Sequence, residues 1–368
     1  MKAYPIQSID LEKAKEMQFR LVDIIHRNFD GNEFLQGGDF GVVPGIGCPQ
    51  YTRKVEGVLA QFFSAEDAVL VRGAGTGAIR NVMNAVLKPN QSIIVHKAPI
   101  YPTTEVIVKA MGLKPVFVDF NKLVEIKEDV ISGISFALLQ HSRQKLDDSY
   151  NLEEVITRLK GINKNIVILV DDNYVVMKAE RIGTESGADI SAFSLFKLLG
   201  PEGIGCVAGS RAVIEIIRKL NYSGGGQVQG HEAMEALRSL VYAPVALAIQ
   251  AEEGNKIVSR LNSGEVEGID TALTANAQSR VILVKFKEPV ARKVLEYAAK
   301  LGAAPYPVGA ESRYEVTAMF YRVSGTFLKS DPELADFMIR INPMRAGADT
   351  VIRVLREAVK KVTEEGRS

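Results

Sequence analysis

The sequence predicts an α/β protein, with a large domain built on a mostly parallel, doubly wound sheet and a smaller α+β domain at the C-terminus. Two observations predict this class. From residue 68 onward, short apolar runs alternate with helical stretches of about 10–15 residues, the pattern of strands joined by crossover helices. After a long helical stretch at about 230–262, the order changes to strand, helix, strands and a last helix.

Seven apolar runs are predicted to be strands of the large sheet, because buried parallel strands are continuously apolar. They are residues 68–73, 92–96, 115–120, 135–141, 165–172, 188–193 and 203–209. Apolar residues recur at helical spacing between some of them, at 75–87, 102–112 and 151–161. Pro102 suits a first helical turn, Gly112 a C-terminal cap and Asn151 an N-cap.

The rest of the chain divides at the long helical stretch. Residues 231–262 contain no strand pattern and are predicted to form a pair of connecting helices. Further strands and helices are expected beyond them, at 280–286, 290–302, 314–322, 337–342 and 348–362. We therefore place the large domain at residues 46–262 and the small domain at 263–368. The N-terminal segment, 1–45, is expected to pack with the small domain.

Composition excludes several classes of protein. The 368 residues carry 45 Lys and Arg against 44 Asp and Glu, so no strong net charge favours nucleic acid or an anionic membrane. Two cysteines and four histidines argue against a disulfide scaffold and a metal cluster. No apolar run is long enough to span a membrane, and the N-terminus does not resemble a signal peptide. We expect a cytoplasmic protein. It contains no tryptophan.

A glycine-rich turn joins the first predicted strand to the first predicted helix and contains Gly75, Thr76 and Gly77. Glycine lets backbone amides approach an anion, the helix N-terminus supplies free N–H groups, and the Thr76 hydroxyl can donate a hydrogen bond. The alternative is a tight turn in which glycine serves geometry alone. The turn is not a dinucleotide-binding motif, because the next strand does not end in an acidic residue.

Two other strand ends carry charged residues. One apolar strand runs into Asp171 and Asp172, at the kind of edge where open α/β sheets bind ligands. A carboxylate there can hold a protonated ring nitrogen, and the alternative is an aspartate that caps the next turn. Lys197 follows another strand in an apolar setting, where desolvation would lower its pKa and let it form a Schiff base with an aldehyde. The alternative is a lysine whose stem covers apolar surface.

The order and spacing of these motifs resemble pyridoxal-phosphate enzymes of the aspartate aminotransferase fold, from about residue 45 to 360. Residues 74–80, AGTGAIR, are similar to the SGTGALR turn of aspartate aminotransferases, and 171–174 and 340–342 match their D-x-x-Y and R-I-N. Residues 170–174, VDDNY, and 187–200 resemble equally well the V-D-N-T-Y and the G-A-D…S-x-T-K segments of the cystathionine and methionine lyases.

The resemblance implies pyridoxal 5′-phosphate as the cofactor. Lys197 would hold it as a Schiff base and move the proton at the α-carbon of the substrate, while Asp171 would keep the ring nitrogen protonated. Arg340 would bind a substrate carboxylate through a two-pronged ion pair. The remaining implied cofactor-binding residues are Gly75, Thr76, Gly77 and Ser194 at the phosphate, and Tyr174 with Ser142 or Arg143 at the ring oxygen.

The missing tryptophan affects the residue that stacks on the cofactor ring, because aspartate aminotransferases use Trp there. Residues 100–104, IYPTT, are similar to the L-Y-G-x-T segment of the lyases, whose tyrosine stacks on the ring. Tyr101 is therefore the expected stacking residue, and His96 is its rival. Phe196 stands where the lyases have threonine, and their Y-x-R motif, which reaches the phosphate of the partner subunit, is not evident.

The resemblance favours an aminotransferase that acts on an amino acid. The alternatives are a lyase that eliminates a β or γ substituent, similar to the cystathionine and methionine lyases or to selenocysteine synthase, and a relative that binds the cofactor without turnover. A phosphate-binding α/β enzyme without this cofactor also stays open. The implied partner is a second copy of the chain, with the site at the interface of a homodimer, and neither nucleic acid, membrane nor metal is expected.

Overall fold

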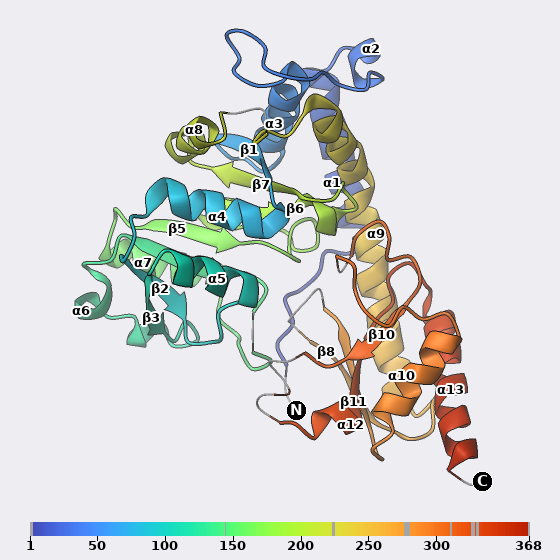
Figure 1. The fold of residues 1–368 in the computed structure, drawn as a ribbon. Helices are drawn as coiled ribbons and strands as arrows, with labels where there is room; N and C mark the ends of the chain where they lie inside the picture. Colours follow the sequence, from blue (N-terminus) through green and yellow to red (C-terminus); the bar gives the residue numbers. More distant parts are fainter. Residues whose placement is uncertain are drawn as a thin grey trace.

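A computed structural model describes residues 3–143, 145–222, 225–275, 280–309, 311–324, 328 and 331–366. It contains one large sheet with helices on both faces and one smaller sheet with helices beside it, as predicted (Figure 1). Within the described ranges, no helix is both long and apolar enough to cross a membrane.

The large sheet has seven strands in the order β1-β7-β6-β5-β4-β2-β3. All neighbours run parallel except β7, which is antiparallel to both β1 and β6. The strands are β1 Asp67–Arg72, β2 Ser92–His96, β3 Lys114–Val118, β4 Phe136–Gln140, β5 Val167–Asp171, β6 Ile190–Ser194 and β7 Ile204–Gly209. Each of them falls within two residues of a predicted strand at both ends. The antiparallel direction of β7 leaves the parallel strands β4, β5 and β6 with their carboxyl ends at one edge.

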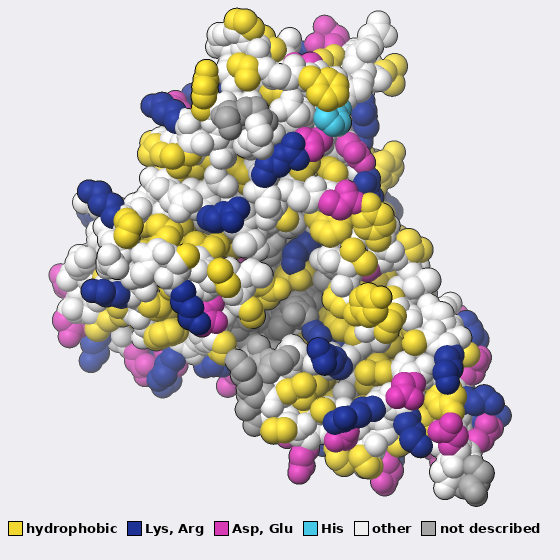
Figure 2. Space-filling model, in the orientation of Figure 1, with side chains coloured by type: hydrophobic (Ala, Val, Ile, Leu, Met, Phe, Trp, Pro, Cys, Tyr) yellow, Lys and Arg dark blue, Asp and Glu magenta, His cyan; other side chains and the backbone are white. Residues whose placement is uncertain are grey.

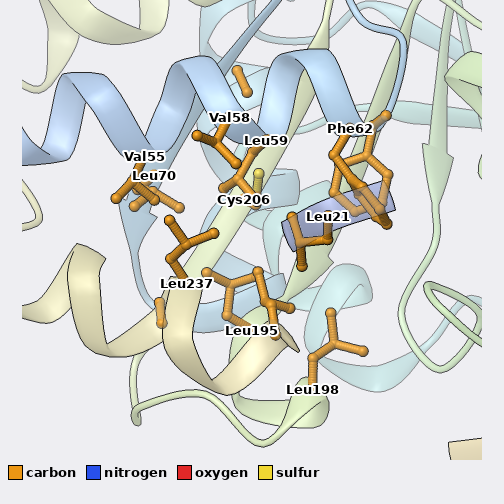
Figure 3. Packing of buried hydrophobic residues seen from close by; sticks show 14 of the residues in the cluster. Leu21, Val55, Val58, Leu59, Phe62, Leu70, Leu195, Leu198, Cys206 and Leu237 are labelled. Atoms are coloured by element: carbon orange, nitrogen blue, oxygen red, sulfur yellow. The ribbon is translucent and has the colours of Figure 1, made fainter. Parts of the chain in front are cut away.

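Alternate side chains of the strands enter separate cores on the two faces, as the two-residue period of a strand requires. One face packs against α4 Ala74–Val86, α5 Pro102–Ala110 and α8 Arg211–Leu220. The opposite face packs against α3 Gln50–Phe62, α7 Leu152–Ile162 and part of α9 Gly230–Asn262. Figure 3 shows the second core, where α3 side chains such as Leu59 meet Cys206 of the sheet and Leu237 of α9.

Helix α1 (Leu11–Asn28) corrects the expectation that the N-terminal segment packs with the small domain. Its apolar face, including Leu21 and Ile25, joins the core formed by α3 and α9 of the large domain. The extended residues before it contact both domains: the Ile9 amide donates to the Lys178 carbonyl, and the Arg280 guanidinium donates to Ser8. The shorter helical elements are α2 Gly31–Phe34, α6 Glu128–Ile131, η1 Leu123–Glu125, η2 Thr184–Ser186 and η3 Leu195–Leu198.

The small domain contains a four-stranded antiparallel sheet in the order β10-β11-β9-β8. Its strands are β8 Ile269–Thr274, β9 Ile282–Phe286, β10 Met319–Arg322 and β11 Met338–Asn342. Its helices are α10 Ala291–Lys300, α12 Leu334–Phe337 and α13 Ala348–Glu365. Strand β8 was not predicted: its sequence IDTALT is only partly apolar, and a register irregularity interrupts its pairing with β9.

The long helical stretch is one helix, α9 (Gly230–Asn262), and not the predicted pair. Pro244 lies inside it without ending it. Buried residues recur along both halves of the helix and favour its continuity: Leu237 and Leu240 belong to the core of the large domain, and Ile257 and Leu261 to that of the small domain. In Figure 1, α9 runs from one domain into the other.

Candidate active site

A cavity of about 690 Å³ lies between the two domains. The large domain lines it with residues from the carboxyl ends of β4, β5 and β6 and from the starts of α4 and α5, and the small domain adds residues from β10 and β11. Figure 2 shows the surface hollowed between the large and the small domain. The volume is within the range of small-molecule sites, and the edge of the sheet is where this architecture binds ligands.

Lys197 lies in η3, directly after β6, and its side chain lines the cavity. Burial lowers the pKa of this amine to about 8, and the carboxylates of Asp171 and Glu311 offset part of that effect. Its Nζ lies 3.3 Å from the centroid of the Tyr174 ring. An amine with such a pKa is partly neutral near pH 8 and can act as a nucleophile or a base.

The two carboxylates after β5 have different surroundings. Asp171 lines the cavity; its Oδ1 accepts hydrogen bonds from the Asn173 amide nitrogen at 3.1 Å and from Asn173 Nδ2 at 2.7 Å. Burial raises the pKa of Asp171, and the bonds from Asn173 oppose this. Asp172 is also buried, but it pairs with His141 Nδ1 at 2.7 Å and accepts from the Gly183 amide, so it serves the structure of the loop.

Two glycines of the glycine-rich turn lie in different places: Gly75 at the cavity and Gly77 behind it. Gly75 lines the cavity, and a Cβ there would lie 2.3 Å from Asn173 Oδ1. Gly77 is not among the lining residues; a Cβ there would lie 2.0 Å from the Arg72 carbonyl oxygen, and its amide already donates to Gly73. The structure therefore gives Gly77 a packing contact, in which α4 closely approaches the end of β1, and a role in cofactor binding stays a prediction.

The end of the cavity beside α4 suits a phosphate group. The buried hydroxyls of Ser194 and Thr104 line it and have no hydrogen-bond partner among the residues that the structure describes. The Ser194 amide donates to Asn173, whose side chain touches Gly75, and Thr76 Oγ1 donates to Thr103 Oγ1. Buried hydroxyls normally find a partner, so this group of donors fits an oxygen-rich anion. Sequence reasoning missed Thr103, Thr104 and Asn173, although IYPTT and VDDNY contain them.

Tyr101 and His96, the two candidates for ring stacking, lie in different places. Tyr101 lines the cavity and hydrogen-bonds the hydroxyl of Tyr174. His96 is buried outside the cavity lining, with Nε2 2.9 Å from Asp148 and Nδ1 accepting from the Phe120 amide, so both ring nitrogens are engaged. Of the two candidates, only Tyr101 therefore lies at the cavity, and that it stacks on the ring stays a prediction.

Tyr174 has a backbone φ of +69°, which an L-residue rarely adopts. Burial raises its pKa well above the usual value. Ser142 lines the cavity nearby, whereas the Arg143 guanidinium donates to the carbonyls of Tyr4, Asp148 and Tyr150. Of the two alternatives for the ring oxygen, the structure therefore places only Ser142 at the cavity.

Arg340 lines the cavity from β11 of the small domain, opposite the residues at the ends of the large-domain strands. Its Nε donates to the Arg322 carbonyl at 2.8 Å, and its guanidinium carbon lies 4.1 Å from the centroid of the Tyr321 ring. These contacts fix the side chain with its guanidinium at the cavity. Burial lowers the pKa of Arg340 without discharging it.

Comparison with known proteins identifies the family. The family model of the aminotransferases of class V matches residues 49–287. The chain belongs to the class-V aminotransferase family. Enzymes of this family depend on pyridoxal phosphate, so the predicted fold and cofactor are confirmed. A second family model, that of the C-terminal domain of YhfS-like proteins, matches residues 255–355 of the chain.

Individual relatives agree with the family. YhfS of Escherichia coli, an uncharacterized protein, is 51% identical over 98% of this chain and 100% of its own. The crystal structure of the pyridoxal-5′-phosphate-dependent YhfS is similar at a TM-score of 0.96 and 50% identity, with 98% of this chain and 100% of that chain covered. A putative cystathionine β-lyase of Listeria monocytogenes has a TM-score of 0.72 at 19% identity over 95% of each chain. Cystathionine γ-synthase of Xanthomonas oryzae has 0.69 at 14%, over 90% of this chain and 92% of its own.

Gly75→Ala is expected to weaken binding of the cofactor by a factor of about 10–100, equivalent to about 1–3 kcal/mol of overpacking. The added methyl would displace Asn173, which holds both Asp171 and the Ser194 amide. Titration of the apoprotein with pyridoxal phosphate measures the effect. Gly57→Ala is the matched control, because nothing lies within 4 Å of a Cβ there. Equal affinities of the two variants would contradict the role given to Gly75.

Proposed function

We propose that this protein is a pyridoxal-phosphate-dependent aminotransferase that acts on an amino acid. The observation that supports it is the convergence in one cavity of the buried Lys197 amine, the Asp171 carboxylate and the Arg340 guanidinium, from two domains. An amine whose pKa is lowered to about 8 can take the α-proton of an amino acid, while an arginine holds its carboxylate. When bound, the cofactor supplies a ring that withdraws electrons from the α-carbon.

Each group of cavity residues has a separate role in the proposed reaction. Lys197 Nζ is proposed to attach the cofactor aldehyde and later to carry the proton to and from the α-carbon. Asp171 keeps a proton on the ring nitrogen, because a buried carboxylate is a strong partner for a cationic N–H. Tyr101 would cover the ring, and Ser142 and Tyr174 would hold its oxygen. The phosphate would be held by hydroxyls and amides near α4, from Gly75, Thr76, Thr104 and Ser194.

A lyase that eliminates a β or γ substituent is the second candidate. Tyr101 in the cavity favours it, because a stacking tyrosine belongs to the lyase branch. Solved structures of the same fold include a putative cystathionine β-lyase and a carbon–sulfur lyase, both at 19% identity. The two reactions share the removal of the α-proton, which is the step that Lys197 performs in both proposals.

Screening amino acids with and without a 2-oxo acid separates the two reactions. We expect turnover that requires the 2-oxo acid and that transfers the amino group to it, with a visible absorbance band in the purified protein that changes on mixing with the amino acid. Release of pyruvate or 2-oxobutyrate without an added acceptor would instead establish elimination. A protein that binds the cofactor but performs neither reaction would be a non-catalytic relative.

A homodimer with its two sites at the interface is part of the proposal. Residues 35–48 project from the large domain and expose Leu35, Phe40 and Val42, apolar side chains that a second copy would cover. Sedimentation at micromolar concentration is expected to give twice the mass of one chain. A monomer that is fully active would contradict an interfacial site. A cytoplasmic location stays a prediction.

A further inference from the structure

A buried group of charged and polar side chains lies behind the active site, outside the cavity lining. Lys178, from the segment after β5, pairs with Glu311 of the small domain, and both are almost completely buried. Gln250 of α9 donates to Glu311 Oε1 and to Asn342, each at 2.8 Å, and accepts from Arg345 at 2.9 Å. The group therefore connects the large domain, α9 and the small domain at one point.

Glu311 belongs to a segment that crosses from the small domain toward Lys197. We call residues 305–316, of which the structure describes all but 310, the strap. Its inner side is close to the residue before the reactive lysine: a Cβ at Gly309 would lie 2.3 Å from the Phe196 ring. Glu315 holds the shape of the strap by accepting from the amides of Val308, Gly309 and Ser312.

Glu311 has a backbone conformation that is unusual for a residue other than glycine. Its φ is +86°, a region where glycine is favoured and other residues are strained. A glutamate there keeps its carboxylate directed at Lys178 and Gln250 at the expense of backbone strain. Outside, Arg313 pairs with Glu235 of α9, and the hydroxyl of Tyr314 donates to Glu202, but these contacts are exposed to solvent and screened.

The charges of the Lys178–Glu311 pair also act on the amine of Lys197. The Nζ atoms of Lys178 and Lys197 lie 5.7 and 3.3 Å from the centroid of the same Tyr174 ring, so both amines lie at one aromatic side chain. Without a nearby carboxylate the two cations would repel each other in a buried setting. Glu311 supplies that carboxylate to Lys178, as Asp171 supplies one to Lys197.

We propose that Glu311 is a positioning residue for Lys197: by pairing with Lys178 and Gln250 it fixes the strap against the segment that carries the reactive lysine and neutralises the second ammonium group at the Tyr174 ring. This inference rests on the proposed role of Lys197. It adds a residue that touches neither substrate nor cofactor.

The proposal predicts shifts of opposite sign when the two charges are removed separately. The groups that face Lys197 are Asp171, Tyr174, Lys178, Glu311 and Glu315, and those that face Glu311 are Lys178 and Arg345. Glu311→Gln removes a negative charge that favours the protonated amine of Lys197, so the neutral amine is favoured and its titration midpoint falls. Lys178→Met removes a positive charge, so the midpoint rises. Each shift is expected to be about 0.5–1 pH unit, a usual size for one nearby charge.

The measurement is the pH midpoint of the rate at which the apoprotein attaches pyridoxal phosphate. The double variant Glu311→Gln/Lys178→Met is expected to lie close to the wild type, because the two charges act in opposite directions. Glu235→Gln, the same change at the exposed contact of the strap, is the matched control and should leave the midpoint unchanged. Cleavage of the strap by a protease should accelerate in Glu311→Gln, since the inner contact is lost.

Shifts in the same direction, or no shift in either single variant, would overturn the proposal. If Glu311→Gln does not fold, Lys178→Met alone decides, because only an upward shift agrees with the proposal. A wild-type protein that attaches no pyridoxal phosphate at Lys197 would overturn the proposed function itself. Normal attachment with unshifted variants would overturn only the role of Glu311.

Discussion

Replacing Lys197 by alanine is expected to lower turnover by about 10⁴-fold or more, the upper range for loss of a general acid–base group. The variant should also lose the covalent attachment of the cofactor, because Lys197 is the cavity lysine that follows β6 with its Nζ beside Asp171 and Tyr174. Borohydride reduction followed by peptide mapping shows where the cofactor is fixed in the wild type, and stopped-flow absorbance measures turnover.

Lys197→Arg is the control for charge, because it keeps a cation after β6 but offers no amine that condenses with an aldehyde. It should be as inactive as the alanine variant. Turnover in either variant near the wild-type rate would show that the chemistry occurs elsewhere. Lys178→Met does not test where the cofactor attaches, because the Lys178 side chain pairs with Glu311 behind the cavity.

Attachment of the cofactor to the apoprotein is expected to accelerate by about 10-fold per pH unit from pH 6 and to level off near pH 8, as for the titration of one group. Only the neutral amine attacks an aldehyde, and burial lowers the pKa of Lys197 from 10.5 to about 8. Below the midpoint the amine is mostly protonated, so attachment is slow and accelerates as the pH rises. Above the midpoint the amine is neutral and the rate is constant. Rates measured by absorbance in buffers from pH 6 to 10 give the midpoint.

Asp171→Asn provides a check on the cause of that midpoint. The Asp171 carboxylate favours the protonated amine of Lys197, so its removal should lower the midpoint below 8. A wild-type midpoint near 10.5, the value of an exposed lysine, would contradict the buried setting of Lys197.

Asp171 and Lys197 were predictable because they lie at or just after the ends of buried strands. In a parallel sheet such ends share one edge, so Asp171 and Lys197 had to lie near each other. The direction of a side chain at the edge is harder to predict. Asp172 and His96 are also at strand ends, but they face loops that supply His141 and Asp148, which lie far from them in the sequence.

Other parts depended on long-range packing that the sequence does not express locally. Thr104 is an ordinary residue of a helical turn until α5 docks and buries its hydroxyl at the cavity. Gly77 stands in the same motif as Gly75, and only the approach of α4 to β1 gives it a different role. The contacts of Glu311 could not be predicted, because its partners Lys178 and Gln250 lie in two other parts of the fold.

The continuity of α9 also determines how the protein loses its structure. One half of this helix completes the core around Leu237, and the other half completes the core around Ile257. A fragment that begins after Asn262 would lack Ile257 and Leu261 and expose the apolar side of the small sheet to water. We therefore expect the two domains to unfold as one cooperative unit, so that a destabilising change in either core lowers the stability of both.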